Sequence, residues 1–229
     1  MANRNNTAVT NDQWHILTDD MPFAVVEAYK ALRTNVMFSL PGGGPKCIGV
    51  TSSNKGEGKS STSLNMAISF AQIGKKVLLI DCDMRLPTVA MRLGIPGIPG
   101  LSNILVQDGK VEDALHHISD LGITVLPSGT IPPDPTYLLN SKRMETVLAV
   151  LKKHYDYVIV DLPPVNVVTD AAIMAKRFDG MVLVVRHNVA EYREVSSMLN
   201  QLQMAEAKIL GVVYNDAPVT SKTYYKHYY

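Results

Sequence analysis

The sequence has little cysteine and no excess of charge of either sign. Its 229 residues include two cysteines, and 22 Lys and Arg balance 21 Asp and Glu for a formal net charge of +1. Cys47 and Cys82 each lie beside or inside an apolar run, which is typical of core residues in a reducing compartment rather than of a disulfide framework. A near-neutral chain also argues against nucleic acid as a partner, because proteins that bind it carry a basic excess or patch. We therefore expect a cytoplasmic protein that does not bind nucleic acid.

Long apolar runs are also missing. No stretch approaches the roughly 18 apolar residues of a membrane helix, and the polar, Asn-rich start has no signal-peptide pattern. The length suits one soluble domain that can bury a large core. We expect a flexible N-terminus over 1–20, a folded α/β domain over 21–215 and a flexible tail over 216–229. Any membrane association should then come through a partner.

Aromatic residues make up only 7% of the chain, but tyrosine is over-represented among them. Ten Tyr stand against four Phe and one Trp, and four of the Tyr fall in the last six residues. The run has no helical or alternating apolar partners, so it cannot bury all four rings on one face. An exposed cluster of this kind is a candidate phosphate acceptor, while a sticky terminus is the alternative. The candidate acceptors are Tyr224, Tyr225, Tyr228 and Tyr229.

Apolar runs and helical patterns alternate after residue 45. Most of the runs are continuously apolar, as in central parallel strands that are covered on both faces. The alternation predicts an α/β fold, a doubly wound, mostly parallel sheet flanked by helices, with ligands at the carboxyl ends of its strands. His116 and His117 are expected on a solvated helix face. The expected strands are Cys47–Thr51, Lys76–Cys82, Ile123–Pro127, Tyr157–Asp161, Gly180–Arg186 and Lys208–Tyr214, and the expected helices include Phe23–Phe38, Lys142–Lys153 behind a Ser141 cap, and Glu191–Met204.

A glycine-rich segment follows the first expected strand and precedes a helical pattern. It reads Ser53-Asn-Lys-Gly-Glu-Gly-Lys-Ser60. A phosphate-binding loop needs small residues, a helix N-terminus, a lysine for the β- and γ-phosphates and a hydroxyl for magnesium, and this segment supplies each part. Ser53 stands where the usual motif has its first glycine, and a turn without a ligand is the alternative. The predicted ATP or ADP site includes Ser53, Gly56, Glu57, Gly58, Lys59, Ser60 and Ser61.

Two expected strands end in carboxylates. Asp81 and Asp83 follow one apolar run, and Asp161 ends another. Carboxyl ends of parallel strands meet at one edge of a sheet, so these acids should converge on the phosphate loop. Magnesium prefers oxygen ligands and retains several waters, which makes the Ser60 hydroxyl together with the three carboxylates the expected Mg²⁺ site. An Asp83–Arg85 ion pair is the alternative role for Asp83.

Together these motifs resemble the bacterial tyrosine kinases, P-loop kinases that control capsule and exopolysaccharide synthesis and that neighbour the MinD/ParA-type ATPases in the P-loop NTPases. The resemblance covers nearly the whole chain, and the short form without membrane helices is similar to the Gram-positive type. In that type a separate membrane protein carries the activating segment. The similar segments are Ser53–Ser60 (Walker A), Asp81, Asp83 and Arg85 (Walker A′), Val158–Asp161 (Walker B), Gly129–Pro135 and Pro163–Asp170.

The resemblance implies ATP- and Mg²⁺-dependent autophosphorylation of the tyrosine cluster in trans. Lys59 would hold phosphates. A tyrosine hydroxyl, with a pKa near 10, benefits from a positioned proton acceptor, and Asp81 is the candidate base. Asp83 would orient metal-bound waters and Asp161 would hold the outer shell of the metal. Asn215, at the end of the last expected strand, is placed at the adenine edge.

The first expected helix carries a polar stripe. Glu27, Lys30 and Arg33 follow one another in steps of three, which keeps them contiguous on a helix surface. Such a stripe is usually a solvated face, but it also resembles the family's E-x-x-R-x-x-R oligomerisation motif with Lys30 in place of the first arginine. The resemblance implies a self-associated ring, a membrane-embedded activator whose cytoplasmic tail activates the kinase, and a cognate tyrosine phosphatase. The protein would then lie at the inner face of the cell membrane through its partner.

Two other functions stay open. A MinD/ParA-type ATPase switch shares the phosphate loop, but that family has a second lysine five residues before the Walker A lysine. Here the position is Asn54, with Lys55 one residue away. The tyrosine tail also favours the kinase. The second alternative is a non-catalytic scaffold for polysaccharide export, which would bind nucleotide only structurally.

Overall fold

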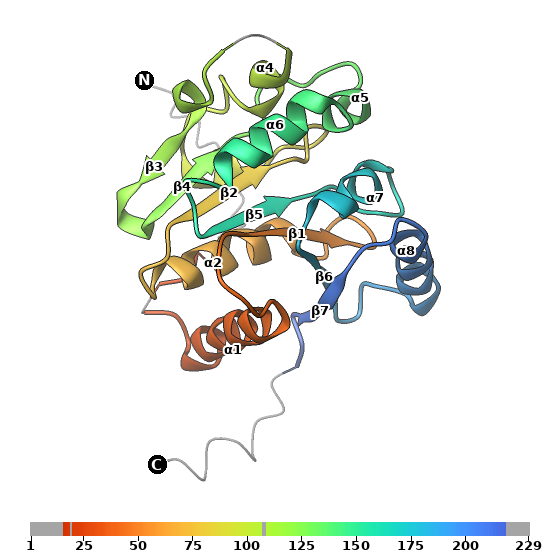
Figure 1. Ribbon diagram of the computed structural model, residues 1–229. Coiled ribbons are helices and arrows are strands. Elements are labelled where there is room, and N and C mark those ends of the chain that lie inside the picture. Colours follow the sequence, from red (N-terminus) through yellow and green to blue (C-terminus); the bar gives the residue numbers. More distant parts are fainter. Residues whose placement is uncertain (1–15, 19, 107–108, 219–229) are drawn as a thin grey trace, which may run out of the picture.

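The computed structural model describes residues 16–18, 20–106 and 109–218, and a seven-stranded sheet lies at its centre (Figure 1). The strand order is β3-β4-β2-β5-β1-β6-β7. All neighbouring strands are parallel except β3, which runs antiparallel to β4. The predicted doubly wound, mostly parallel sheet is thus confirmed. The strands are β1 (Lys46–Ser52), β2 (Val77–Asp81), β3 (His116–Ile118), β4 (Ile123–Leu126), β5 (Tyr157–Asp161), β6 (Gly180–Arg186) and β7 (Ile209–Asn215).

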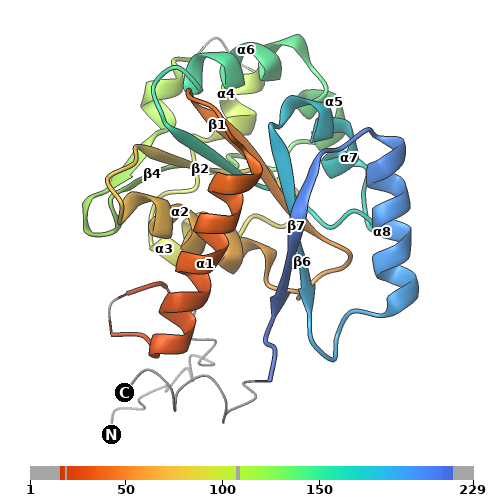
Figure 2. The ribbon, with the colours of Figure 1, turned by 60° about the horizontal axis from the view of Figure 1, so that its bottom comes forward.

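Helices cover both faces of the sheet and enclose two hydrophobic cores (Figure 2). One core lies between the sheet and α1 (Phe23–Ser39), α2 (Lys59–Ala71) and α3 (Val89–Leu93). The opposite core lies under the remaining α-helices. These are α4 (Leu101–Val106), α5 (Pro135–Leu139), α6 (Lys142–Leu151), α7 (Asp170–Met174) and α8 (Tyr192–Met204); the short 3₁₀ turns are Val111–Ala114, Ser119–Leu121 and Ala175–Arg177.

The central strands send alternate side chains into the two cores. In β2, Leu78 and Ile80 enter the core under α4 to α8, whereas Val77 and Leu79 enter the core under α1 to α3. Burying one such side chain contributes roughly 1.5–3 kcal/mol. Because both faces are covered, these strands have no polar side and read as continuous apolar runs.

The expected elements are found, most of them with ends that differ by one or two residues, and one expectation is wrong in kind. β5 and β6 keep their expected bounds, and the Ser141 cap of α6 is confirmed, since its hydroxyl accepts a hydrogen bond from the Met144 N–H at 3.1 Å. The expectation for His116 and His117 was wrong, because they lie in β3 and not on a helix. A three-residue edge strand carries too little pattern to predict, and its pairing with β4 determines its conformation.

The described part of the chain also tests its expected boundaries. Leu17 falls in the segment expected to be flexible, yet its side chain is only 2% exposed and its N–H donates to Asn65 Oδ1 at 2.9 Å. Packing therefore begins before residue 21. The four candidate acceptor tyrosines lie outside the described residues. Within the described ranges, no helix is both long and apolar enough to cross a membrane.

Candidate active site

The glycine-rich segment connects β1 to the start of α2, as predicted. Gly58 immediately precedes α2 with a φ of 93°, a conformation that favours glycine. A Cβ on Gly58 would also overlap the amide nitrogen of the Asn215 side chain. Since glycine offers no side chain to cap α2, the N–H groups of the first turn depend on other acceptors, and a phosphate is a suitable one.

The buried Glu57 carboxylate forms hydrogen bonds with other residues of this loop. Its side chain is completely buried, and Oε1 accepts hydrogen bonds from the Ser53 hydroxyl and from the Asn54 N–H, the latter at 2.6 Å. Oε2 accepts one from the Arg186 N–H at 3.3 Å. The carboxylate of Glu57 therefore orders the loop backbone, and the contact of this residue with a nucleotide stays a prediction.

The ends of β6 and β7 also contact the loop. Asn215 Nδ2 donates to the Glu57 carbonyl at 2.9 Å, so its side chain lies on the loop backbone. Arg186 donates from Nη1 to the Gly56 carbonyl at 3.1 Å and pairs with Asp216 at 3.1 Å. Sequence reasoning gave Arg186 no role, because nothing near it in the sequence separates it from an ordinary surface arginine. Its loop contact joins positions 130 residues apart.

Lys59 lies among the acids that were expected to meet it. Its Nζ is 2.9 Å from Asp83 Oδ2, 3.6 Å from Asp161 Oδ2 and 3.2 Å from the Ser60 hydroxyl. Burial disfavours the charged amine, but the attraction of Asp161 and Asp83 outweighs it, so the pKa of Lys59 is raised. A charged amine at the start of α2 is the group that a phosphate-binding loop needs.

Asp83 does not pair with Arg85, so that alternative is wrong. Arg85 instead bonds both oxygens of Asp170, with Nε 3.1 Å from Oδ2, and reaches the Thr136 hydroxyl at 3.0 Å. Thr136 in turn donates to Asp170 at 2.6 Å. This network joins the segment after β2 to the first residues of α5 and α7, and it leaves Asp83 facing Lys59.

Asp81 and Asp161 lie side by side because they are register partners on β2 and β5. Asp161 is fully buried, and its Oδ1 accepts a hydrogen bond from the Ser63 hydroxyl at 3.2 Å. Among the described residues its Oδ2 has no hydrogen-bond partner, and Lys59 Nζ is the nearby cation. Burial raises the pKa of Asp161, against the attraction of Lys59.

Asp81 is held by backbone N–H groups. One oxygen accepts from Asp83 N at 3.1 Å, and the other accepts from Thr88 N and Val89 N, at 3.2 and 3.1 Å, at the start of α3. Burial, followed by repulsion from Asp161, raises the pKa of Asp81 to about 7. A group with this pKa changes protonation at neutral pH, which suits proton transfer.

The residues fit a magnesium ion that is shared with phosphates. The Ser60 hydroxyl is buried beside Lys59, and the bare Oδ2 of Asp161 offers a hydrogen-bond acceptor to a metal-bound water. Within the described ranges no group of three or more His, Cys, Asp or Glu could hold a metal without help. Phosphate oxygens and waters would complete the shell, as is usual for magnesium.

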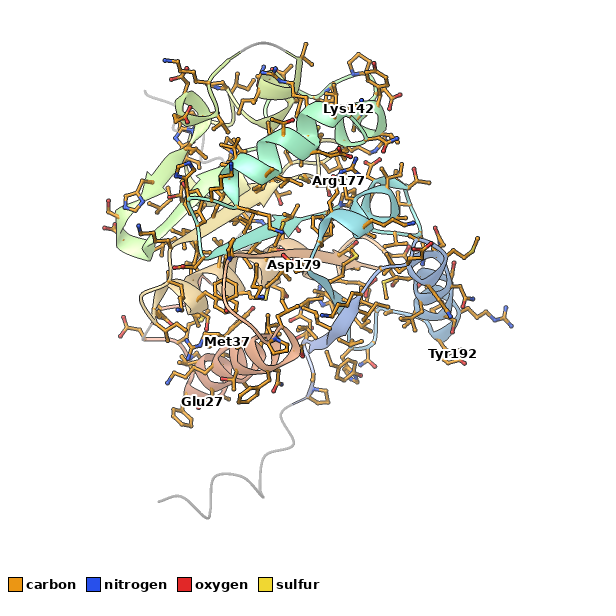
Figure 3. All side chains as sticks on the ribbon, in the orientation of Figure 1. Glu27, Met37, Lys142, Arg177, Asp179 and Tyr192 are labelled. Atoms are coloured by element: carbon orange, nitrogen blue, oxygen red, sulfur yellow. The ribbon has the colours of Figure 1, made fainter. Side chains whose placement is uncertain are left out.

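The polar stripe on α1 is divided. Glu27 and Lys30 form an exposed pair at 2.8 Å, and Glu27 lies on the outer side of the helix in Figure 3. Arg33 turns toward α2, where Nη1 donates to the Ser69 carbonyl at 2.7 Å and to its hydroxyl at 3.2 Å. Two members of the stripe thus face outward, and the third joins α1 to α2.

Comparisons with known proteins agree with this geometry. Residues 45–210 match the model of the AAA_31 family, described as an AAA domain. The chain is 35% identical over 211 residues to the putative tyrosine-protein kinase CapB of Staphylococcus aureus, with 92% of each chain covered. It is 37% identical to the tyrosine-protein kinase YwqD of Bacillus subtilis, covering 88% of this chain and 85% of the relative.

Solved structures show the same relationship. The kinase domain of the Escherichia coli tyrosine kinase ETK matches with a TM-score of 0.82 at 31% identity, covering 91% of this chain and 85% of that one. The chimerical protein CapA2B2 matches with a TM-score of 0.81 at 35% identity and 87% coverage of each chain. MinD of Pyrococcus horikoshii, solved with Mg-ADP, shares the fold with a TM-score of 0.63 at 23% identity, covering 74% of this chain and 70% of that one. The chain therefore belongs to the bacterial tyrosine kinases, within the AAA_31 group of P-loop proteins.

Proposed function

We propose that this protein transfers the γ-phosphoryl group of ATP to tyrosine, including the cluster Tyr224, Tyr225, Tyr228 and Tyr229 of a neighbouring copy, and thereby regulates capsule or exopolysaccharide synthesis and export. One observation carries the proposal: in a chain of the tyrosine kinase family, Lys59 and three buried carboxylates converge at the start of α2. Magnesium, when bound with ATP, supplies charge neutralisation at the phosphates.

The residues divide the work of the transfer. Lys59, which contacts Asp83 at 2.9 Å, would bind the phosphates, and Asp83 and Asp161 would hold the waters of a bound magnesium ion, which would supply charge neutralisation. Asp81 accepts hydrogen bonds from three N–H groups, and a carboxylate has about four acceptor positions, so one remains for a tyrosine hydroxyl. The tyrosine oxygen bonds to the γ-phosphorus as the bond to the β–γ bridging oxygen breaks. The phenolic proton passes to Asp81, and ADP leaves with the electron pair of the broken bond.

The setting of the kinase is also a proposal. By family resemblance we infer a membrane-embedded activator with a cytoplasmic activating tail, a ring of copies and a cognate tyrosine phosphatase, with the kinase at the inner face of the membrane through its partner. The likeness to CapA2B2, a chimerical protein, supports a kinase that works together with a second chain. The exposed Glu27–Lys30 pair supports an available α1 face.

The test is co-expression with the proposed membrane-embedded activator, followed by incubation with Mg-ATP, anti-phosphotyrosine blotting and mass spectrometry of residues 216–229. We expect labelling of the tail. Lys59→Met should abolish it by removing the cation for the phosphates. Asp81→Ala should abolish it while nucleotide binding largely persists, because Asp81 acts on the acceptor.

Matched outcomes separate the alternatives. Replacing the four terminal tyrosines with phenylalanine should remove most of the label and leave ATP binding intact. Undiminished phosphotyrosine in Asp81→Ala would refute the role of Asp81 as the base. Phosphate release without any phosphotyrosine would indicate the ATPase switch, and nucleotide binding without turnover, even with the partner, would indicate the scaffold.

A further inference from the structure

The guanidinium of Arg186, the last residue of β6, joins the phosphate loop to the residue that follows β7. Its Nη1 donates to the Gly56 carbonyl at 3.1 Å, while Nε and Nη2 donate to Asp216 Oδ2 at 3.2 and 3.1 Å. All three nitrogens of the planar group are thus bonded, which fixes its orientation as a single contact would not. Asp216 therefore holds Arg186 against the loop.

Two consecutive carbonyls of the loop are bonded from the same edge of the sheet. The Gly56 carbonyl accepts from Arg186, and the Glu57 carbonyl accepts from Asn215 Nδ2 at 2.9 Å. Arg186 and Asn215 are register partners at the ends of β6 and β7. The two donors therefore act together on neighbouring peptide groups.

The bonded carbonyls determine where the next N–H groups point. In a planar trans peptide the carbonyl and the following N–H point in opposite directions, and both of these peptides are trans. The N–H groups of Glu57 and Gly58 are therefore directed away from the Arg186 and Asn215 side chains. Within the described ranges no backbone hydrogen bond uses either N–H. Two such donors at the start of α2 suit an anion.

We propose that Arg186 is a positioning residue of the nucleotide site. By bonding the Gly56 carbonyl it fixes the loop so that the N–H groups face the phosphates, and Asp216 acts through it by holding the guanidinium. This assignment rests on the proposed function for the nucleotide site and concerns a residue outside the loop. Backbone N–H groups of such loops hold the α- and β-phosphates, so the effect extends to ADP as well as ATP.

Asp216 distinguishes positioning from a simple effect of charge. If Arg186 acted only as a nearby positive charge, removing the negative charge of Asp216 would strengthen the binding of an anionic nucleotide. If Arg186 acts through its position, the same substitution loosens the guanidinium and weakens binding. The direction of the change in Asp216→Asn therefore separates the two roles.

The test is titration calorimetry in magnesium with ADP and with a non-hydrolysable ATP analogue. We expect Arg186→Met to weaken both nucleotides about tenfold, because the charge-assisted hydrogen bond that orders the loop is lost. Arg186→Lys should recover part of the loss, since a lysine lacks the fork geometry that holds both partners. Asp216→Asn should weaken both about threefold, because its bond to Arg186 becomes a weaker neutral one. Added to Arg186→Met, it should cause no further loss.

Tail phosphorylation gives a second measurement. Arg186→Met should raise KM for ATP and change kcat less than about twofold, as expected for a residue that supports ground state and transition state equally. Arg177→Met is the matched control, because Arg177 also bonds a backbone carbonyl and an acid, the Ile173 carbonyl at 3.1 Å and Glu145 of α6 at 3.0 Å (Figure 3). It should leave both affinities within about twofold.

Unchanged ADP affinity in Arg186→Met, or tighter binding in Asp216→Asn, overturns the proposal. Should Arg186→Met fail to fold, the direction of the change in Asp216→Asn decides. If the unmodified chain binds nucleotide but makes no phosphotyrosine, the kinase proposal fails, while a loss of affinity in Arg186→Met and Asp216→Asn still supports the role of Arg186.

Discussion

At the scale of single residues, Asp81 is a carboxyl group whose surroundings oppose its charge. Burial and then Asp161 raise its pKa to about 7, compared with about 3.9 for an unperturbed aspartate. The folded state therefore binds this proton more tightly than the unfolded state between about pH 4 and pH 7. The stability that Asp81 contributes is complete below about pH 4 and is lost as the pH rises through 7.

Asp81→Asn should reduce this pH dependence, because an amide does not titrate. Urea unfolding of the nucleotide-free protein at pH 5 and pH 7.5 would measure it. We expect the free energy of unfolding to fall between these two pH values in the unmodified protein and to fall less in Asp81→Asn. The exposed Asp113→Asn should keep the full decline. Equal declines in all three proteins would contradict the raised pKa.

At the scale of elements, the phosphate loop is held between α2 and the ends of β6 and β7. Its two glycines provide a matched pair of probes. Gly56 has a φ of 81° with open space around its Cα, whereas Gly58 has a φ of 93° and faces the Asn215 side chain. An alanine at either position would be strained by the positive φ. At Gly58 its Cβ would in addition clash with the Asn215 side chain.

Gly58→Ala should therefore destabilise the protein more than Gly56→Ala. Positive φ costs about 1–2 kcal/mol in both variants, and displacing Asn215 should add about 1–3 kcal/mol in Gly58→Ala. Chemical denaturation measures the difference. Asn215→Ala added to Gly58→Ala should recover part of the loss by making space. If the two glycine variants lost the same free energy of unfolding, the Asn215 side chain would have moved aside without destabilising the fold.

The elements show where sequence reasoning succeeds. Lys59 and the three acids could be placed together because each ends or follows a strongly apolar strand, and parallel strands bring those ends to one edge. The inward-facing carboxylate of Glu57 and the loop contact of Arg186 could not be predicted, because both depend on β6 lying beside β1.

At the scale of the whole molecule, α1 packs into the core beside α2, and Arg33 adds hydrogen bonds between the two helices. Its two hydrogen bonds to Ser69 tie the first helix to α2, while Glu27 and Lys30 face outward. The proposed oligomerisation motif thus combines an internal contact with an external surface. Substitution of Arg33 tests the internal contact, and substitution of Glu27 tests the external surface.

Arg33→Ala should lower the free energy of unfolding by about 1–3 kcal/mol, because removal of the charged donor leaves the Ser69 carbonyl without its hydrogen bond from Arg33. Glu27→Ala should change it by less than about 1 kcal/mol, as is usual for an exposed ion pair, and should weaken self-association. Thermal unfolding and sedimentation velocity give the two readouts. If the unmodified protein sediments as a monomer at high concentration, the ring proposal is wrong. If Arg33→Ala is as stable as the unmodified protein, Arg33 does not stabilise the contact between α1 and α2.

The register of β2 and β5 also restricts how this chain can change in length. Asp81 and Asp161 occupy paired positions on neighbouring strands, and side chains of a strand alternate between its two faces. Deleting one residue inside β2 would turn Asp81 from the α2 side of the sheet to the side covered by α4 to α8. Insertions and deletions tolerated during evolution should therefore gather in the loops, and the spacing from the start of β2 to Asp81 should be among the last features to vary.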